Sequence, residues 1–249
     1  KMVPFAGYEM PIQYKAGLMA EHLHTRSSAG LFDVSHMGQL RIAAKSGDVR
    51  DAALALETLI PADYAALGVH RQRYGLLTND EGGIRDDLMV ANMGQDLFVV
   101  VNASCKHQDA DLIEKALGDR CIVTRHFDRA LIALQGPEAQ NALASLCPAA
   151  ADMKFMDAIE TELAGVSVTL SRSGYTGEDG YEIGIAAKDA ETVASALLAQ
   201  PQVLPIVLCA RYSLRLEAGL CLLCNDIDPT ATPIEPSLTS PIQKSRRDS

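Results

Sequence analysis

The sequence lacks the features that mark several large classes of protein. No apolar run approaches the roughly 18 residues of a membrane-spanning helix, so we expect no membrane span. Basic residues are in the minority, with 22 Lys and Arg against 32 Asp and Glu and a formal net charge of −10. Nucleic-acid phosphates repel so acidic a chain, and we expect no nucleic-acid partner. No signal or transit peptide is visible, and the start at Lys1 rather than methionine indicates a trimmed N-terminus.

Motifs of the common nucleotide and nucleophile sites are also missing. The chain contains no Gly-x-Gly-x-x-Gly, no P-loop lysine and no Gly-x-Ser-x-Gly. A Rossmann dinucleotide site, a P-loop and a hydrolase nucleophile elbow are therefore excluded. Cys221-Leu222-Leu223-Cys224 is a lone Cys-x-x-Cys without the second pair that a structural zinc site needs, and the six histidines show no metal-ligand spacing. We expect no metal and six reduced, mostly buried cysteines.

What the sequence does contain is enough apolar material for a folded core. Its 249 residues are 48% hydrophobic, which fits one large or two modest domains rather than disorder. Antiparallel groups of strands with helices between them favour an α+β fold over a doubly wound parallel sheet. The expected strands cover residues 39–43, 72–78, 84–91, 96–101, 131–135, 166–170 and 181–186. The expected helices cover residues 47–59, 104–117, 187–198 and 210–220, with one more opened by Gly136-Pro137.

The most unusual segment is the loop from Gly174 to Glu182, which reads Gly-Tyr-Thr-Gly-Glu-Asp-Gly-Tyr-Glu between two strand-like runs. Asp179-Gly180 is a strong hairpin signal, because glycine reaches a positive φ without steric cost. A turn explains neither Tyr175 nor Glu182. Glu182 is either solvated, since glutamate is rarely buried without a partner, or placed with Tyr175 to bind a flat, polar ligand.

Two adjacent acids, Asp86 and Asp87, lie within one expected strand and must point to opposite faces of it. Burying both would be costly. One interpretation leaves one acid in water and pairs the other with Arg85. The alternative holds a carboxylate on a rigid strand at the wall of a pocket. Arg211 and Arg215 are four residues apart on an expected helix, where surface ion pairs are the ordinary explanation.

Five blocks follow one another along nearly the whole chain. They are MVPFAGYEMP at 2–11, GLFDVSHMG at 30–38, GGIRDDL at 82–88, GYTGEDGYE at 174–182 and SLRLEAGL at 213–220. In sequence and in order, these blocks resemble the aminomethyltransferase (T protein) family of the glycine cleavage system. The roles of Glu182, Tyr175 and the two adjacent aspartates, which residue spacing alone left open, can therefore be interpreted from the family.

The resemblance implies an α+β fold of two intertwined lobes with mainly antiparallel sheets and flanking helices. Residues 1–40 and 129–225 would form a discontinuous first folate-binding lobe. Residues 41–128 would form a second lobe that carries the Asp-Asp-Leu strand. The family also has a C-terminal β-barrel domain that this sequence does not contain. Residues 226–249, with a basic end that includes Arg247, would be an exit segment toward that domain.

The family transfers the one-carbon unit of glycine from the aminomethyl-lipoyl arm of H protein to tetrahydrofolate, releasing ammonia and forming 5,10-methylenetetrahydrofolate. By motif, the resemblance implies that Asp87 is the catalytic acid and that Glu182 holds the pterin of the folate. The other implied ligand contacts are Arg211, Tyr175, Met37, Asn102 and Tyr74. Lipoylated H protein and folate are the expected partners of a monomeric protein. Its expected compartment is the cytoplasm of a bacterium or the mitochondrial matrix of a eukaryote.

The resemblance weakens toward the C-terminal end. Tyr212 stands where the family has aspartate, Cys224 where it has glycine, and Ser240 where a tryptophan is expected. One alternative is therefore a truncated or non-catalytic folate-binding paralogue. The iron–sulfur-assembly branch of such paralogues carries a Lys-Gly-Cys-Tyr-x-Gly-Gln-Glu motif, which this chain lacks. Another alternative is the folate domain of a demethylating flavoenzyme such as sarcosine or dimethylglycine dehydrogenase.

Overall fold

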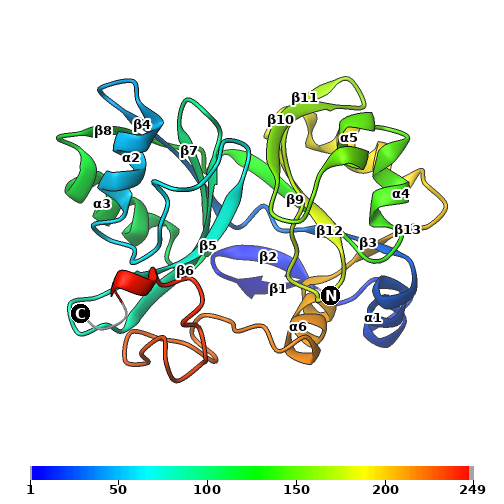
Figure 1. Cartoon of the computed structure of the whole chain (residues 1–249). Helices are drawn as coiled ribbons and strands as arrows, with labels where there is room; N and C mark the ends of the chain where they lie inside the picture. The colour runs from blue at the N-terminus through cyan, green and yellow to red at the C-terminus, as the bar shows by residue number, and fades with distance from the viewer. Residues whose placement is uncertain (1, 247–249) are drawn as a thin grey trace. The chain divides into compact units, whose positions relative to one another are not determined.

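The chain folds into two compact units, each built on its own sheet (Figure 1). A computed structural model describes residues 2–246. Unit 1 combines Lys1–His36 with Asp128–Leu220, and unit 2 combines Met37–Phe127 with Cys221–Ser249. Among the described residues, no helix is both long and apolar enough to cross a membrane.

The described residues of unit 1 form eight strands and four α-helices. They are β1 (Met2–Phe5), β2 (Tyr8–Pro11), α1 (Leu18–Ser27), β3 (Ala29–Asp33), β9 (Arg129–Gln135), α4 (Ala139–Ala144), β10 (Ala158–Leu163), β11 (Val166–Ser171), β12 (Gly180–Ala186), α5 (Ala190–Leu198), β13 (Val203–Ile206) and α6 (Leu208–Glu217), with short 3₁₀ helices at Pro148–Asp152 and Ala187–Asp189. Six of the strands form a sheet in the order β10-β11-β12-β9-β3-β13, antiparallel except for the pair β3 and β13. Helices α1 and α6 pack on each other and on β3.

The core of unit 1 explains the orientation of the residues after the unusual loop. Tyr181, Ile183 and Ile185 on β12 are fully buried in the main apolar cluster of this unit. Successive side chains of a strand point to opposite faces. Glu182 therefore projects from the opposite face of β12, away from that cluster, where its side chain is 15% exposed.

Unit 2 contains a five-stranded antiparallel sheet in the order β5-β6-β7-β4-β8. Its elements are β4 (Gly38–Ala44), α2 (Val49–Leu56), β5 (Gln72–Thr78), β6 (Ile84–Asn92), β7 (Leu97–Val101), α3 (Lys106–Leu117) and β8 (Cys121–Arg125), followed by a 3₁₀ turn at Lys244–Arg246. The expected meander over residues 72–101 corresponds to β5, β6 and β7. Helix α2 begins after Asp48, whose side chain accepts a hydrogen bond of 2.9 Å from Arg50 N. This N-cap is why the helix starts later than the expected residue 47.

Residues 221–246 return to unit 2 instead of leaving it. Ile84 N donates a hydrogen bond of 3.1 Å to Ala231 O, and Gln243 N donates one of 2.7 Å to Pro61 O. Ile227 is buried in a small cluster with Ile84. The described part of residues 226–249 therefore packs on unit 2, and its role as an exit segment toward a further domain stays a prediction. Arg247 and the two residues after it lie outside the described residues.

The cysteines are less buried than the sequence led us to expect. All six are free thiols, but only Cys121 and Cys147 are buried, and Cys224 is exposed. Cys224 has a φ of 65°, a left-handed conformation that favours glycine. The backbone here thus keeps the conformation suited to the family's glycine, at a strain cost on the order of 1 kcal/mol.

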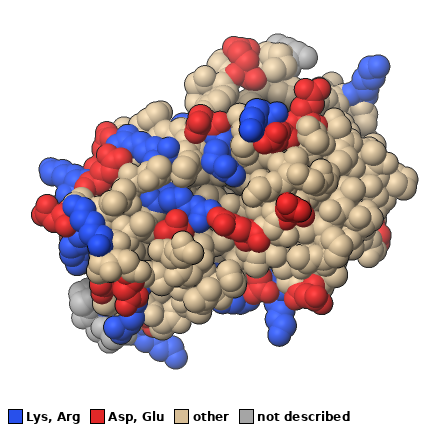
Figure 2. All heavy atoms as spheres, turned by 90° about the horizontal axis from the view of Figure 1, so that it is seen from above, with Lys and Arg blue, Asp and Glu red and all other residues tan. Residues whose placement is uncertain are grey.

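Charged side chains of both signs share the surface. Figure 2 shows one face of the molecule on which Lys and Arg are interspersed with Asp and Glu. Mixed charges of this kind give many weak surface ion pairs, such as Arg125 with the half-exposed Glu114 at 2.6 Å.

Candidate functional site

Unit 2 brings three of the predicted site residues together around one carboxylate. Asp87 lies on β6, and its Oδ2 accepts a hydrogen bond of 3.0 Å from the Tyr74 hydroxyl on the neighbouring strand β5. Its Oδ1 accepts one of 2.7 Å from Asn102 Nδ2, one residue after β7. Hydrogen bonds on both oxygens fix the orientation of the carboxylate. The interpretation that placed a carboxylate on a rigid strand therefore fits the geometry.

The adjacent acid has a different environment. Asp86 is fully buried, and its side chain accepts hydrogen bonds of 3.0 Å from Asn102 N and 2.8 Å from Asn102 Nδ2. Asn102 therefore connects the two acids. Arg85 is exposed and forms no ion pair with either acid among the described residues. The interpretation that paired one acid with Arg85 while the other faced water is wrong, because both acids use Asn102 instead.

Burial tunes the acidity of Asp87. Desolvation and, to a smaller extent, the charge of Asp86 raise the pKa of Asp87 to about 6, while the hydrogen bonds from Tyr74 and Asn102 limit the rise. A carboxyl group with this pKa is mostly ionised at neutral pH, yet it still accepts and returns a proton readily. A general base or acid works best when its pKa lies near the working pH.

Unit 1 brings three other predicted residues together. Arg211 on α6 places its guanidinium carbon 5.0 Å from the centre of the Tyr175 ring, a cation–π contact. Arg211 Nη2 lies 3.6 Å from Glu182 Oε1, which is an ion pair but too long for a hydrogen bond. Arg211 is 9% exposed, and its buried Nη1 has no hydrogen-bond partner among the described residues. Buried N–H groups are rarely left unpaired, so this cluster has unused capacity for a polar ligand.

The glycines of the loop over residues 174–182 serve two different needs. Gly177 has a φ of 85°, whereas Gly180 is the first residue of β12 and has no positive φ. The expectation that Gly180 supplies the positive φ of a hairpin turn is therefore wrong. A Cβ at Gly174 or Gly180 would collide with the side chain of Gln135. Gln135 is fully buried and donates a hydrogen bond of 3.0 Å to Ser173 O, so the loop is wrapped closely around it.

A family model described as the GCVT N-terminal domain matches residues 1–246. The chain belongs to the GCVT family. The mitochondrial aminomethyltransferases of Dictyostelium discoideum and Homo sapiens are each 42% identical to it, over 100% and 99% of this chain. The chain spans 64% and 62% of the length of these two relatives.

Solved structures agree with the fold of this GCVT-family chain. The glycine cleavage system aminomethyltransferase T from Bartonella henselae superposes with a TM-score of 0.91 at 40% identity, over 100% of this chain and 67% of that one. The α+β fold with mainly antiparallel sheets is thus confirmed. A heterotetrameric sarcosine oxidase from Corynebacterium matches at a TM-score of 0.52 and 24% identity, over 80% of this chain and 92% of that one. That likeness shows a related fold and nothing more.

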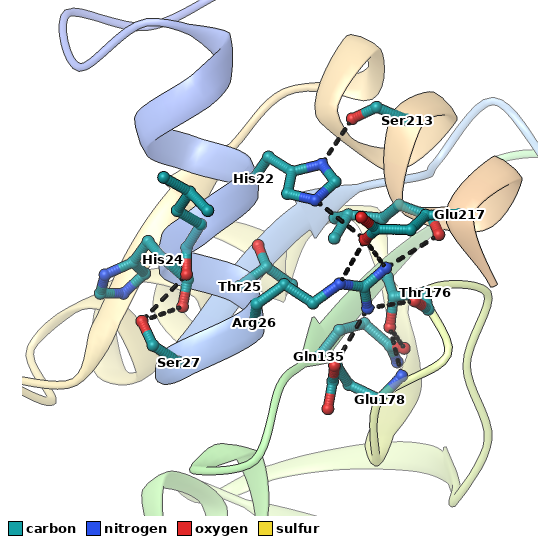
Figure 3. A network of polar contacts seen from close by, with 12 residues as sticks. His22, His24, Thr25, Arg26, Ser27, Gln135, Thr176, Glu178, Ser213 and Glu217 are labelled. Carbon is teal, nitrogen blue, oxygen red and sulfur yellow. Dashed lines mark hydrogen bonds and ion pairs between the residues drawn. The ribbon is translucent and has the colours of Figure 1, made fainter.

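An arginine that the sequence analysis missed anchors the loop of the GCVT-family chain to its helices (Figure 3). Arg26 on α1 donates from Nη1 to Thr176 O at 2.5 Å and to Glu178 Oε1 at 3.0 Å. Its Nη2 donates to Leu214 O on α6 at 3.1 Å, and its Nε donates to Glu217 at 2.9 Å. One guanidinium therefore ties the segment that follows Tyr175 to the helix that carries Arg211. No motif in the sequence marked Arg26, because the helix it lies on was itself not recognised.

His22 lies beside this network and resembles part of a catalytic triad without being one. Its ring nitrogens lie 2.8 Å from Ser213 Oγ and 3.1 Å from Glu217 Oε2 (Figure 3). Ser213 Oγ, however, donates to Ala210 O within the same helix at 3.0 Å, so its proton is not directed at a base. Glu217 is 59% exposed and already shared with Arg26. We assign the trio a structural role.

Met37 is the last of the predicted site residues. It is half-buried in the bend before β4. Its role in lining a ligand pocket stays a prediction of the family resemblance.

Proposed function

We propose that this chain carries out an aminomethyltransferase reaction: transfer of the one-carbon unit of glycine from the aminomethyl-lipoyl arm of H protein to tetrahydrofolate. The C–S and C–N bonds of the aminomethyl group break, and the products are ammonia, 5,10-methylenetetrahydrofolate and dihydrolipoyl H protein. The observation that carries the proposal is Asp87, a carboxylate held by Tyr74 and Asn102 with a pKa of about 6, in a chain of the GCVT family. The curated relatives are named aminomethyltransferases, and this chain spans less than two thirds of their length, so the reaction is a proposal here.

The cluster in unit 1 would recognise the pterin. A pterin edge presents adjacent N–H donors, and the Glu182 carboxylate can accept two of them in parallel. A charge-assisted hydrogen bond of this kind contributes roughly 1.5–3 kcal/mol. The unpaired Nη1 of Arg211 would donate to an acceptor of the same ligand, such as a pterin oxygen or a carboxylate. The Tyr175 ring, which Arg211 already contacts, would pack against the flat heterocycle.

The cluster in unit 2 would act on the reacting amine. An ionised Asp87 can orient the folate amine, accept its proton, and stabilise the cationic iminium that forms as ammonia departs. Tyr74 and Asn102 hold the carboxylate so that little reorganisation accompanies the reaction. Asn102 and Met37 would also line the ligand pocket.

Lipoylated H protein is the proposed protein partner, and we propose a monomer without a bound metal. The compartment also remains a proposal, either bacterial cytoplasm or mitochondrial matrix; the curated relatives named above are mitochondrial. Folate binding and transfer are separate claims, and they need separate measurements.

One assay tests the transfer. Ammonia release from aminomethyl-loaded H protein is followed with and without tetrahydrofolate, together with formation of methylenetetrahydrofolate. Tetrahydrofolate-dependent release of both products is expected. A chain that binds tetrahydrofolate but releases no ammonia would be a non-catalytic paralogue. Formation of methylenetetrahydrofolate from an N-methyl amine supplied with its flavin dehydrogenase, without H protein, would indicate the demethylating alternative.

A further inference from the structure

A second carboxyl group is buried next to Asp86, on the side of β6 away from Asp87. Asp109 on α3 is 4% exposed and Asp86 is 0% exposed. Their carboxyl groups are in hydrogen-bonding contact. Two carboxylates cannot form such a contact unless one of them is protonated.

The hydrogen bonds show which carboxyl group holds the proton. Asp86 accepts from Asn102 N and from Asn102 Nδ2, which stabilises its charged form. No N–H or O–H donor of a described residue reaches the buried Oδ2 of Asp109. A neutral Asp109 that donates to a charged Asp86 satisfies both groups, whereas the reverse assignment gives a charged Asp109 one donor at most, from Asp86, and leaves the two donors of Asn102 directed at a neutral Asp86.

The charges around the pair favour the same assignment. Desolvation, the hydrogen bond with Asp86 and the charge of Asp86 together raise the pKa of Asp109 to about 9, and Arg85 opposes this only weakly from the surface. Burial raises the pKa of the nearby Cys105 thiol to about 11, so this group stays neutral. Lys106, the first residue of α3, places its ammonium 5.4 Å from the centre of the Phe127 ring.

We propose that Asp109 is a positioning residue that keeps its proton at neutral pH, donates it to Asp86, and thereby fixes the Asn102 amide that orients the Asp87 carboxylate. The chain of contacts runs from α3 through Asp86 and Asn102 to Asp87. The proton also limits the charge next to Asp87 to one unit. The proposal rests on the proposed function, because it assigns Asp109 to the carboxylate that acts in that reaction.

Loss of the proton has a definite consequence. Above about pH 9 Asp109 becomes ionised, and its repulsion of Asp86 strains the hydrogen bonds to Asn102. The Asp87 carboxylate then loses its fixed orientation, and misplacing a reacting group by about 1 Å can lower turnover about 100-fold. Asn at position 109 would supply a neutral donor at every pH, whereas Leu would supply none.

The first test does not depend on catalysis. Infrared difference spectra of the wild-type chain and the D109N variant at pH 8, where Asp87 with its pKa of about 6 is ionised, should show the carbonyl stretch of a protonated carboxylic acid in the wild type alone. D111N is the matched control, since Asp111 lies on the same helix with a 71% exposed side chain. Absence of the protonated band from the wild type, or its persistence in D109N, overturns the proposal.

The second test links the proton to turnover. At pH 7 D109L should lose about tenfold or more in kcat with little change in KM, and D109N should recover most of that loss. The ratio of kcat for D109N to that of the wild type should rise as pH passes 9. A ratio that stays flat to pH 10, or equal losses in D109N and D109L, overturns the positioning role. If the protonated band is present but the wild type has no transfer activity, the proposed function fails and the protonated pair stands.

Discussion

Replacing Asp87 by asparagine should lower turnover and raise stability at the same time. The pKa of Asp87 is about 6 in the fold against an ordinary 3.8. Each pKa unit corresponds to about 1.4 kcal/mol, so holding the charged form in the fold costs about 3 kcal/mol at neutral pH. Asparagine removes this cost and can still accept from Asn102 through its Oδ1. The same change removes the proton acceptor, which should reduce kcat by about 10²–10⁴.

The sign of the pH dependence follows from proton linkage. Between pH 4 and 6 the folded wild type binds more protons at Asp87 than the unfolded chain does, so its free energy of unfolding falls as pH rises through that window. D87N lacks this slope. The stability difference between D87N and the wild type should therefore be near zero at about pH 3.5 and approach about 3 kcal/mol at pH 7.

Urea denaturation of both chains from pH 3.5 to 8 measures the difference. D80N is the control, since Asp80 is exposed in the turn before β6. A difference that does not change with pH, or a wild type more stable than D87N at pH 7, would refute the reasoning about burial. Near-normal turnover in D87N would refute the catalytic assignment, whatever its stability.

Two further predictions concern folate binding in unit 1. R26K keeps the charge of Arg26, but lysine cannot reach the four partners of Arg26 together, so tetrahydrofolate affinity measured by calorimetry should fall about tenfold. The control R120K, on the exposed surface, should leave that affinity unchanged. Equal affinities of R26K and the wild type would show that the loop holds its position without Arg26. E182Q replaces a carboxylate that accepts two donors by an amide that accepts one, and should weaken tetrahydrofolate binding by about 1.5 kcal/mol or more, with E162Q on the exposed face of β10 as its control. A folate affinity that E182Q leaves intact would remove Glu182 from the ligand site.

The sheet of unit 2 was predictable because its strands have regular local patterns. Gln72–Thr78 was predicted with the bounds that β5 has, and β6 was predicted to within one residue. Turn-forming glycines at 82 and 83 separate the two strands, and the first six residues of β6 alternate buried with less buried positions. Helix α1 could not be found in the same way. Its buried residues are Glu21 and Thr25, both polar, so no apolar stripe marks it.

The site was predictable only in part, for a similar reason. Family motifs named Asp87 and Glu182, and the structure brings Tyr74 and Asn102 to the first and Tyr175 and Arg211 to the second. The residues that hold these groups in place were not predictable. Arg26 and Asp109 act through contacts with residues far away in the sequence, and neither belongs to a motif. A residue whose role depends on tertiary contacts leaves no local pattern.

The interruption of unit 1 by residues 37–127 has a consequence for synthesis on the ribosome. The strands of the unit 2 sheet all lie between Gly38 and Arg125, so this sheet can form as soon as that stretch has emerged. Strand β3 must wait for β9, since Gly30 pairs with Gln135, and closing so long a loop is slow. We expect the nascent chain to expose β3 and α1 while unit 2 folds. The apolar residues of β3 and α1 would stay exposed during this time, so we expect this segment to depend most on chaperones.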